Sequence, residues 1–134
     1  MTDSEPLPAA EFAHPGPLRD TLVAAIVSGT KTSTSSLLAD YDTADLPEAG
    51  QRFRVIDSEG WDVCVIEVDT VRTMRLGDVD RTHAVAEGEG FKTVAEWREA
   101  HERFWESSSD RPAVDAVHLD DDTMVVLETF HLRF

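Results

Sequence analysis

The first regular pattern along the chain is helical. Leu18, Leu22 and Ile26 recur at intervals of four residues, which places their side chains on one face of a helix. A proline stands where such a helix would begin and Gly29 stands just past its end, the favoured positions for both residue types. The pattern therefore predicts a helix over residues 17–28.

Alternation of apolar and polar positions predicts strands further along the chain. Phe53 and Val55 alternate with polar residues, and residues 57–60 have the composition of a hairpin turn. An apolar run over residues 61–71 follows, so we expect a second strand that is antiparallel to the first and buried on both faces. Renewed alternation predicts a terminal strand over residues 124–134.

Two more helices are expected between these strands, a short one over residues 76–86 and a longer one over residues 94–105. The terminal strand must pair with strands from the first half of the chain, so the sheet joins distant segments. This order fits a small closed or half-closed β-barrel surrounded by short helices better than a doubly wound parallel sheet. The predicted fold class is therefore α+β.

Length and composition predict one globular domain. A chain of 134 residues with 41% hydrophobic and 29% charged residues has an ordinary composition and room for one core. Prolines, acidic residues and small residues dominate residues 1–16, which is typical of a loosely ordered segment. We therefore expect a flexible lead-in over residues 1–16 and the folded domain over residues 17–134.

The chain is strongly acidic, with 12 basic and 27 acidic residues and a formal net charge of −15. Such a surface repels nucleic-acid phosphates, so we expect no DNA partner, and RNA binding would need a local basic patch. A small, weakly charged ligand meets no such barrier. The acidity is equally consistent with a solubility trait, and the sequence leaves its meaning open.

Nothing in the sequence indicates a membrane partner. No apolar stretch approaches the roughly 18 residues that cross a bilayer, and the N-terminus is acidic, unlike the basic start of a signal peptide. The only cysteine, Cys64, cannot form an internal disulfide. We therefore expect a cytoplasmic protein, and its oligomeric state stays open.

The strongest candidate for chemistry is Lys31, one of only two lysines. It follows the helix-capping glycine within residues 30–36, a hydroxyl-rich stretch that favours extended backbone. A partly desolvated lysine can lose its proton and act as a base toward a nearby hydroxyl such as that of Thr34. A solvated lysine in a polar loop is the alternative.

A second candidate is the Glu-Gly-Glu-Gly run that begins at Glu87. It places Glu87 and Glu89 between glycines at the end of a predicted helix, where backbone can approach a ligand closely. Carboxylates at such a place can accept a proton, orient a lysine or hydrogen-bond the amino edge of a base. A solvated turn is again the alternative.

Other polar clusters carry less information. Residues 120–122 are three aspartates without the spaced ligands and turn glycine of a calcium loop, and the five histidines lack zinc-site spacing. Trp97, His101 and Trp105 share one helix face, a pattern more typical of core packing than of a stacking platform. We therefore expect neither a metal nor an organic cofactor.

Four segments, taken in order, resemble the ASCH domain family of the PUA-like superfamily. They are residues 28–38, which contain a Gly-x-Lys-x-x-Thr motif, and residues 46–50, 86–90 and 97–105. The resemblance covers residues 17–134 and implies a β-barrel surrounded by short helices, with a cleft beside the Gly-x-Lys-x-x-Thr segment. Compared with the minimal hydrolases of the family, this chain has an added loop at residues 40–45 and an extra turn at residues 87–92.

Small bacterial members of this family hydrolyse the acetyl amide of N4-acetylcytidine with a lysine and a threonine of that segment and a glutamate further along. The resemblance therefore implies that Lys31, Thr34 and Glu89 are catalytic. Glu87 is the competing carboxylate, because the repeated Glu-Gly permits either alignment. We also expect substrate contacts from Gly29, Thr32, Glu87 and Arg54.

From these observations we predict an amidohydrolase that removes an acyl group from a modified nucleoside such as N4-acetylcytidine. In this hypothesis Thr34 attacks the acyl carbonyl, neutral Lys31 takes its proton, and Glu89 orients the lysine or protonates the leaving amine. Two alternatives stay open. One is an RNA-binding PUA-like module or ribonuclease that uses the same cleft and the arginines Arg52, Arg54, Arg72 and Arg75, and the other is a non-catalytic sensor of a modified base.

Overall fold

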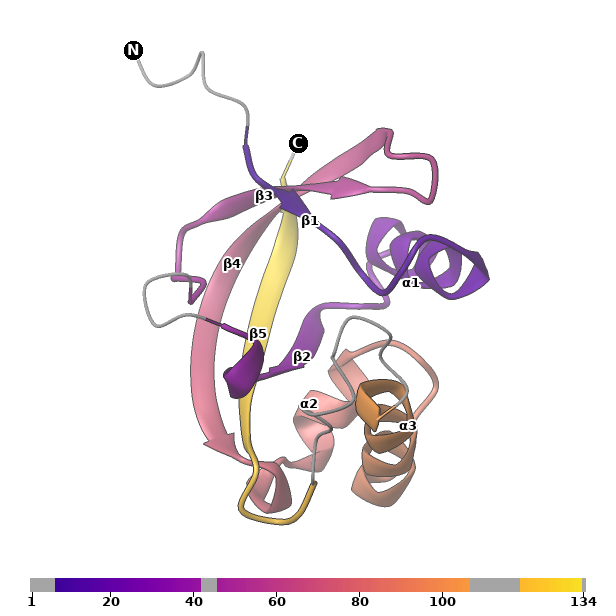
Figure 1. The fold of residues 1–134 in the computed structure, drawn as a ribbon. Coiled ribbons are helices and arrows are strands. Elements are labelled where there is room, and N and C mark those ends of the chain that lie inside the picture. Colours follow the sequence, from indigo (N-terminus) through magenta and orange to yellow (C-terminus); the bar gives the residue numbers. More distant parts are fainter. Residues whose placement is uncertain (1–6, 42–45, 107–118, 134) are drawn as a thin grey trace.

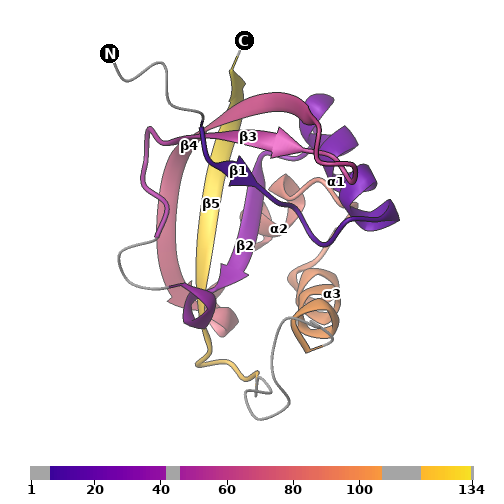
Figure 2. The ribbon, with the colours of Figure 1, turned by 45° about the horizontal axis from the view of Figure 1, so that its top comes forward.

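The computed structural model describes residues 7–41, 46–106 and 119–133. These residues form a single five-stranded sheet with helices packed against it, which confirms the α+β class. The strands are β1 (Ala9–Ala10), β2 (Ser33–Leu37), β3 (Arg52–Ile56), β4 (Asp62–Arg75) and β5 (Met124–Arg133). The long strands β4 and β5 run side by side through the centre of the sheet (Figures 1 and 2).

The sheet has the strand order β1-β3-β4-β5-β2, with β1 parallel to β3 and the other neighbours antiparallel. As predicted, the terminal strand pairs with segments from the first half of the chain. The predicted closure into a barrel is absent from the described residues, because β1 and β2 are the two edges of the sheet and do not pair with each other. The sheet is therefore open between these two strands.

The helices expected over residues 17–28 and 94–105 are present with nearly the predicted bounds, whereas the one expected over residues 76–86 is divided into a 3-10 turn and a shorter helix. The helices are α1 (Pro17–Val27), α2 (Arg81–Ala86) and α3 (Val94–Glu106), with single 3-10 turns η2 (Leu38–Asp40) and η4 (Leu76–Asp78). α1 leads into the first residues of β2, and α2 lies beside the same half of that strand, where the Thr32 amide donates to Ala86 and the Ser33 hydroxyl to His83 (Figure 2). Within the described residues, no helix has the length and apolar character needed to cross a bilayer.

Two clusters of buried side chains lie on the two faces of the sheet. Alternate residues of β5 point to opposite faces of the sheet. On the side of α2 and α3, Leu127 packs with Leu37 and Trp97. On the side of α1, Phe130 packs with Ile26. The sequence predicted that the second central strand is buried on both faces. The second half of β4 is instead largely exposed, because helices cover only part of this long strand.

The segment before α1 belongs to the fold although the sequence places it in the lead-in. Ala9–Ala10 pairs with β3, and Phe12 is buried in the cluster beneath α1. The buried guanidinium of Arg19 donates hydrogen bonds to the carbonyl oxygens of Ala13 and Asp57, which fixes this segment against α1. A two-residue strand has no periodicity, so sequence pattern gives no sign of it.

Candidate functional site

A cavity of about 690 Å³ occupies the place where the sheet stays open. It is lined by both edge strands, by Ala9 and Ala10 of β1 and by Thr34, Ser35 and Ser36 of β2, and by side chains of α1 and α3. This volume lies within the range of roughly 300–1,000 Å³ that is usual for sites binding small molecules. The gap in the sheet is therefore the candidate functional site.

Lys31 reaches this cavity from the turn that follows α1. Gly29 adopts a positive φ of 82° there, and the Lys31 amide donates to the carbonyl of Ala25, so the helix ends in a fixed turn. The side chain is buried, and its Nζ donates to the carbonyl oxygens of Ser33, at 2.8 Å, and Glu87, at 3.3 Å. This explains why a lysine can be buried beside an edge strand, whose outward carbonyls otherwise lack partners.

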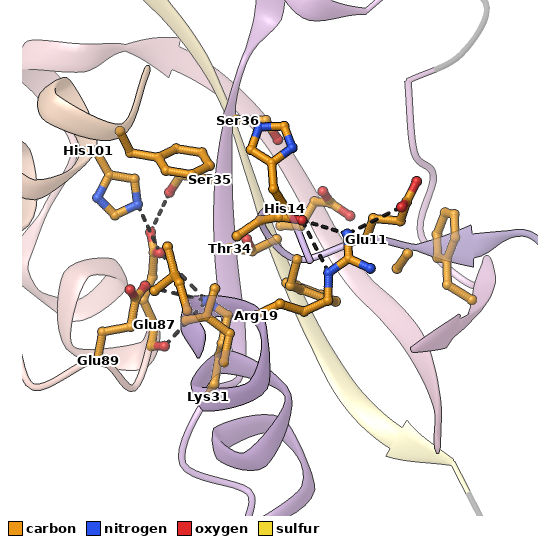
Figure 3. A pocket seen from close by; sticks show the side chains of 18 of the residues that line it. Glu11, His14, Arg19, Lys31, Thr34, Ser35, Ser36, Glu87, Glu89 and His101 are labelled. Atoms are coloured by element: carbon orange, nitrogen blue, oxygen red, sulfur yellow. Dashed lines mark hydrogen bonds and ion pairs between the residues drawn. The ribbon is translucent and has the colours of Figure 1, made fainter. Parts of the chain in front are cut away.

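Two carboxylates complete the surroundings of Lys31. Its Nζ lies 3.6 Å from Oε1 of Glu87 and 3.7 Å from Oε2 of Glu89, and Figure 3 shows both side chains beside it. Four oxygen atoms around one amine stabilise its positive charge. These contacts favour a charged ammonium group on Lys31, whereas the sequence analysis expects a neutral amine. A fixed ammonium can polarise the carbonyl of a bound ligand.

Glu87 is the buried anchor of this cluster. Its side-chain oxygens accept hydrogen bonds from Ser35, His83, Trp97 and His101. Burial on its own would raise the pKa of Glu87, but the hydrogen bonds from His101 and His83 and the charge of Lys31 outweigh it and hold the pKa well below its usual value. Glu87 is therefore an anion whose carboxylate oxygens already accept hydrogen bonds from neighbouring side chains.

Glu89 lies in a different environment, because its side chain keeps 23% of its surface exposed and lines the cavity. Burial raises the pKa of Glu89, and the neighbouring charge of Glu87 adds to this, against the opposing charge of Lys31. A carboxyl group that holds its proton more tightly is suited to give that proton to a leaving group. This difference favours Glu89 over Glu87 as the reactive carboxyl.

The glycine between the two glutamates explains how they reach Lys31. Gly88 has a positive φ of 70°, and a Cβ added to it would lie 2.6 Å from the carbonyl oxygen of Thr30 and 2.7 Å from the amide nitrogen of Lys31. The two backbone segments are thus in direct contact. The close approach that the sequence predicts is made to the protein itself.

His101 is a functional candidate that the sequence places in the core. Trp97 and Trp105 are buried, as expected, and His101 stacks on Trp97. His101 also lines the cavity and forms a hydrogen bond with Glu87 (Figure 3). Burial would lower the pKa of His101, but its hydrogen bond to Glu87 and the charge of that carboxylate raise it overall. The four-residue spacing indicates the shared face and gives no sign that this face ends at a cavity.

Thr34 also lines the cavity, as the sequence predicts, but it points from the other face of β2 than Ser33 and Ser35. Its partner directly across the strand pair is Glu128 of β5, which lines the same cavity. Burial raises the pKa of Glu128 to about 7. Sequence analysis missed Glu128, although a carboxylate at an apolar position of an alternating strand is a usable signal.

The burial of Glu128 predicts how stability depends on pH. Glu128→Gln is expected to stabilise the protein at pH 8 by up to about 3 kcal/mol, and to have little effect at pH 4. The folded-state pKa of about 7 lies above the ordinary value of 4.5. The contribution of protonated Glu128 to folding stability is therefore complete below pH 4.5 and is lost as the pH rises through about 7, because the site disfavours the charged carboxylate. Urea unfolding at both pH values measures this, and a variant less stable than the wild type at pH 8 would contradict it.

Three expected substrate contacts lie outside the cavity lining. Gly29 caps α1, and its amide is already bonded to the carbonyl of Ile26. Thr32 is exposed, and its amide donates to the carbonyl of Ala86. The guanidinium of Arg54 pairs with Asp62 on the neighbouring strand. Most amides near the helix cap are thus engaged in the turn and are not available to a ligand.

Three ligand atoms of Glu87, Glu89 and His101 lie within 4.8 Å of one another, a spacing that a metal ion could use. The Lys31 ammonium is already adjacent to both carboxylates, at 3.6 and 3.7 Å. A divalent cation placed there would be repelled by this fixed positive charge. The cluster is therefore best explained with Lys31 as its cation.

Comparison with known proteins places the chain in one family. The model of the ASCH domain family matches residues 9–132. The crystal structure of an ASCH domain from Lactobacillus crispatus is similar over 95% of this chain and 79% of its own, with 26% identity and a TM-score of 0.81. A protein from Enterococcus faecalis is similar over 84% of this chain and 67% of its own, with 30% identity and a TM-score of 0.72. No curated protein matches the sequence. The chain therefore belongs to the ASCH domain family.

Proposed function

We propose that this protein is a hydrolase that removes an acyl group from the exocyclic amine of a modified nucleoside such as N4-acetylcytidine. The observation that carries the proposal is a buried Lys31 ammonium, held beside two carboxylates of different protonation behaviour, in a cavity that Thr34 also lines. A nucleophilic hydroxyl, a fixed positive charge and a proton-carrying carboxyl are the parts that amide hydrolysis needs.

Each of the three residues has one role in the proposed reaction. The Oγ1 atom of Thr34 attacks the acyl carbon as its proton passes to an acceptor in the cavity, which returns that proton to Oγ1 when the ester is later hydrolysed. The ammonium of Lys31 stabilises the negative charge that develops on the carbonyl oxygen. Glu89 gives its proton to the leaving amine as the carbon–nitrogen bond breaks. Water then hydrolyses the acyl ester on Thr34, and Glu89 recovers its proton from that water.

Size and charge support a single nucleoside as the substrate. A cavity of about 690 Å³ accommodates a ligand of that size, and aromatic side chains such as Tyr41, Phe53 and Phe104 line it. Aromatic rings offer stacking surfaces to a base, and carboxylates accept hydrogen bonds from amino groups. The net charge of −15 favours a neutral nucleoside over a phosphorylated one.

The arginines considered for RNA binding give that alternative little support. Three of them form ion pairs with acidic neighbours: Arg52 with Glu67, Arg54 with Asp62, and Arg75 with Asp122. Their charge is thereby largely neutralised at short range, which weakens attraction to phosphates. In the part of the chain that the structure describes, no specific observation favours an RNA-binding module or a ribonuclease over the nucleoside hydrolase.

Hydrolysis of N4-acetylcytidine by the purified protein, followed by chromatography of the released cytidine, tests the proposal. Thr34→Ala is expected to lower kcat by at least about 10²-fold, because the attacking oxygen is lost. Thr32→Ala is the matched control, since Thr32 lies on the same segment outside the cavity lining and its loss should leave kcat unchanged.

The outcomes separate the candidate functions. Binding of N4-acetylcytidine without hydrolysis would indicate the non-catalytic sensor. Full activity of the Thr34 variant would overturn its assignment as nucleophile. Absence of both binding and hydrolysis, together with salt-sensitive binding of short RNAs, would replace the proposal with the RNA-binding alternative.

A further inference from the structure

Glu128 and Thr34 occupy directly opposite positions on neighbouring strands. β2 and β5 are antiparallel, and their register pairs Thr34 with Glu128. Opposite residues of such a pair project to the same face with Cβ atoms about 4.5–5.5 Å apart, a distance that a glutamate side chain spans. Both residues line the cavity. The sheet therefore presents a hydroxyl and a carboxyl side by side to a bound ligand.

The hydroxyl of Thr34 needs a proton acceptor if it is to attack an acyl carbon. Lys31 is surrounded by four oxygen atoms that favour its charged form, so it has no free electron pair to offer. Glu87 is occupied by hydrogen bonds, and Glu89 lies at Lys31 and is assigned to the leaving amine in the proposed reaction. The strand register places one further carboxyl next to Thr34, that of Glu128.

The carboxyl of Glu128 is available for such a step. Within residues 7–41, 46–106 and 119–133, it has no hydrogen bond or ion pair, and its charge acts on the nearby phenol of Tyr41. Besides Tyr41, the other charged or titratable side chains that line the cavity from the elements around it are those of Glu11, His14, Arg19, Lys31, Asp40, Glu87, Glu89 and His101. A half-buried carboxyl without a fixed partner can move toward a neighbouring hydroxyl when a ligand fills the cavity.

We propose that Glu128 is a further catalytic residue, the general base that accepts the proton of the Thr34 hydroxyl. This inference rests on the proposed function. As Oγ1 of Thr34 bonds to the acyl carbon, its proton passes to Glu128, and the carbon–nitrogen bond then breaks with a proton from Glu89. In the second half-reaction water attacks the acyl ester, Glu89 takes the proton from that water, and Glu128 returns its proton to the departing Oγ1. Both carboxyls end in their starting states, so one water is consumed and one acid and one amine are released.

The titration of Glu128 agrees with this role. Burial raises the pKa of Glu128 to about 7. A base is most effective when its pKa is close to the working pH, because it is then both deprotonated and strong enough to accept a proton. Deprotonation of Glu128 is therefore expected to contribute a rise in the rate of the wild-type protein through about pH 7, and loss of the proton from Glu89 contributes a fall.

Glu128→Gln tests the inference with N4-acetylcytidine as the probe. We expect kcat to fall by about 10²–10⁴-fold, with the rise through pH 7 lost and KM nearly unchanged. Glu128→Asp should restore part of kcat together with a pH-dependent rise, and it provides a second variant if the glutamine variant fails to fold. Glu67→Gln is the matched control, because Glu67 lies on β4 outside the cavity lining and should keep the wild-type kcat and pH profile.

The results distinguish this inference from the function on which it rests. If the wild type hydrolyses the nucleoside, Thr34→Ala is inactive, and Glu128→Gln keeps both kcat and the rise through pH 7, then the inference is wrong and the proposed function stands. If the wild type releases no cytidine, both are overturned. A fall in kcat for Glu128→Gln with an unchanged pH profile would assign Glu128 a structural role and also overturn the inference.

Discussion

Glu87→Gln is expected to lower the free energy of unfolding at pH 7 by about 3–5 kcal/mol, whereas Glu89→Gln should change it by less than about 1 kcal/mol. Glu87 is 1% exposed and is bonded to four side chains, in addition to its ion pair with Lys31. Its amide replacement would leave the buried ammonium and the donors around it short of a negative partner. Glu89 is partly exposed, and burial raises its pKa, so a glutamine there removes a charge that the site disfavours.

Urea unfolding of both variants at pH 7 and at low pH measures this difference. The pKa of Glu87 is lowered in the folded state, so its contribution to stability is present above the unfolded-state pKa, about 4.3, and is lost as the pH falls through the lower folded-state value. The gap between the wild type and Glu87→Gln should therefore narrow in acid. A Glu87 variant as stable as the wild type, or a Glu89 variant that is the weaker of the two, would reverse the assigned roles.

Gly88→Ala is expected to destabilise the protein by at least about 3 kcal/mol and to lower activity. The added methyl group would lie 2.6–2.7 Å from backbone atoms of Thr30 and Lys31, at a φ of 70° that residues with a Cβ rarely adopt. Neither backbone segment can move without breaking the turn after α1. Any movement would also draw Glu87 and Glu89 away from Lys31.

Gly90→Ala is the matched control for this prediction. Gly90 also has a positive φ, 89°, but an added Cβ would meet no atom within 4 Å. The same substitution there should cost only about 1 kcal/mol, the conformational part of the effect. Thermal unfolding and N4-acetylcytidine hydrolysis measure both variants. Equal losses of stability and activity at the two positions would show that the contact between Gly88 and Lys31 does not contribute to stability.

The elements of the fold were largely predictable from the sequence because each depends on local order. Periodicity alone indicates α1, α3 and β5 with boundaries close to those observed. The Gly-x-Lys-x-x-Thr and Glu-Gly-Glu-Gly motifs also identified Lys31 and the glutamates, since an unusual lysine and paired acidic residues are visible without a structure. The family resemblance then linked these motifs, and the match over residues 9–132 confirms it.

The choice among candidate residues depended on three-dimensional packing. Glu87 and Glu89 are alike in the sequence, and only their different burial and partners make one an anchor and the other a proton carrier. Arg54 was a reasonable substrate contact by residue type, but the pairing of β3 with β4 directs it to Asp62. His101 sits at a core position of its helix, yet that face extends into the cavity.

By itself, then, the sequence determined most of the longer elements, the family and the chemical types gathered near Lys31, because hydrophobic spacing and short motifs are properties of neighbouring residues. The tertiary structure decided that the sheet stays open, that the opening is the cavity, and that Thr34 lies beside Glu128 on the neighbouring strand of its wall. These features arise between segments that are distant along the chain. Their geometry is set by strand register and by which buried charges find partners, and neither is encoded at a single position.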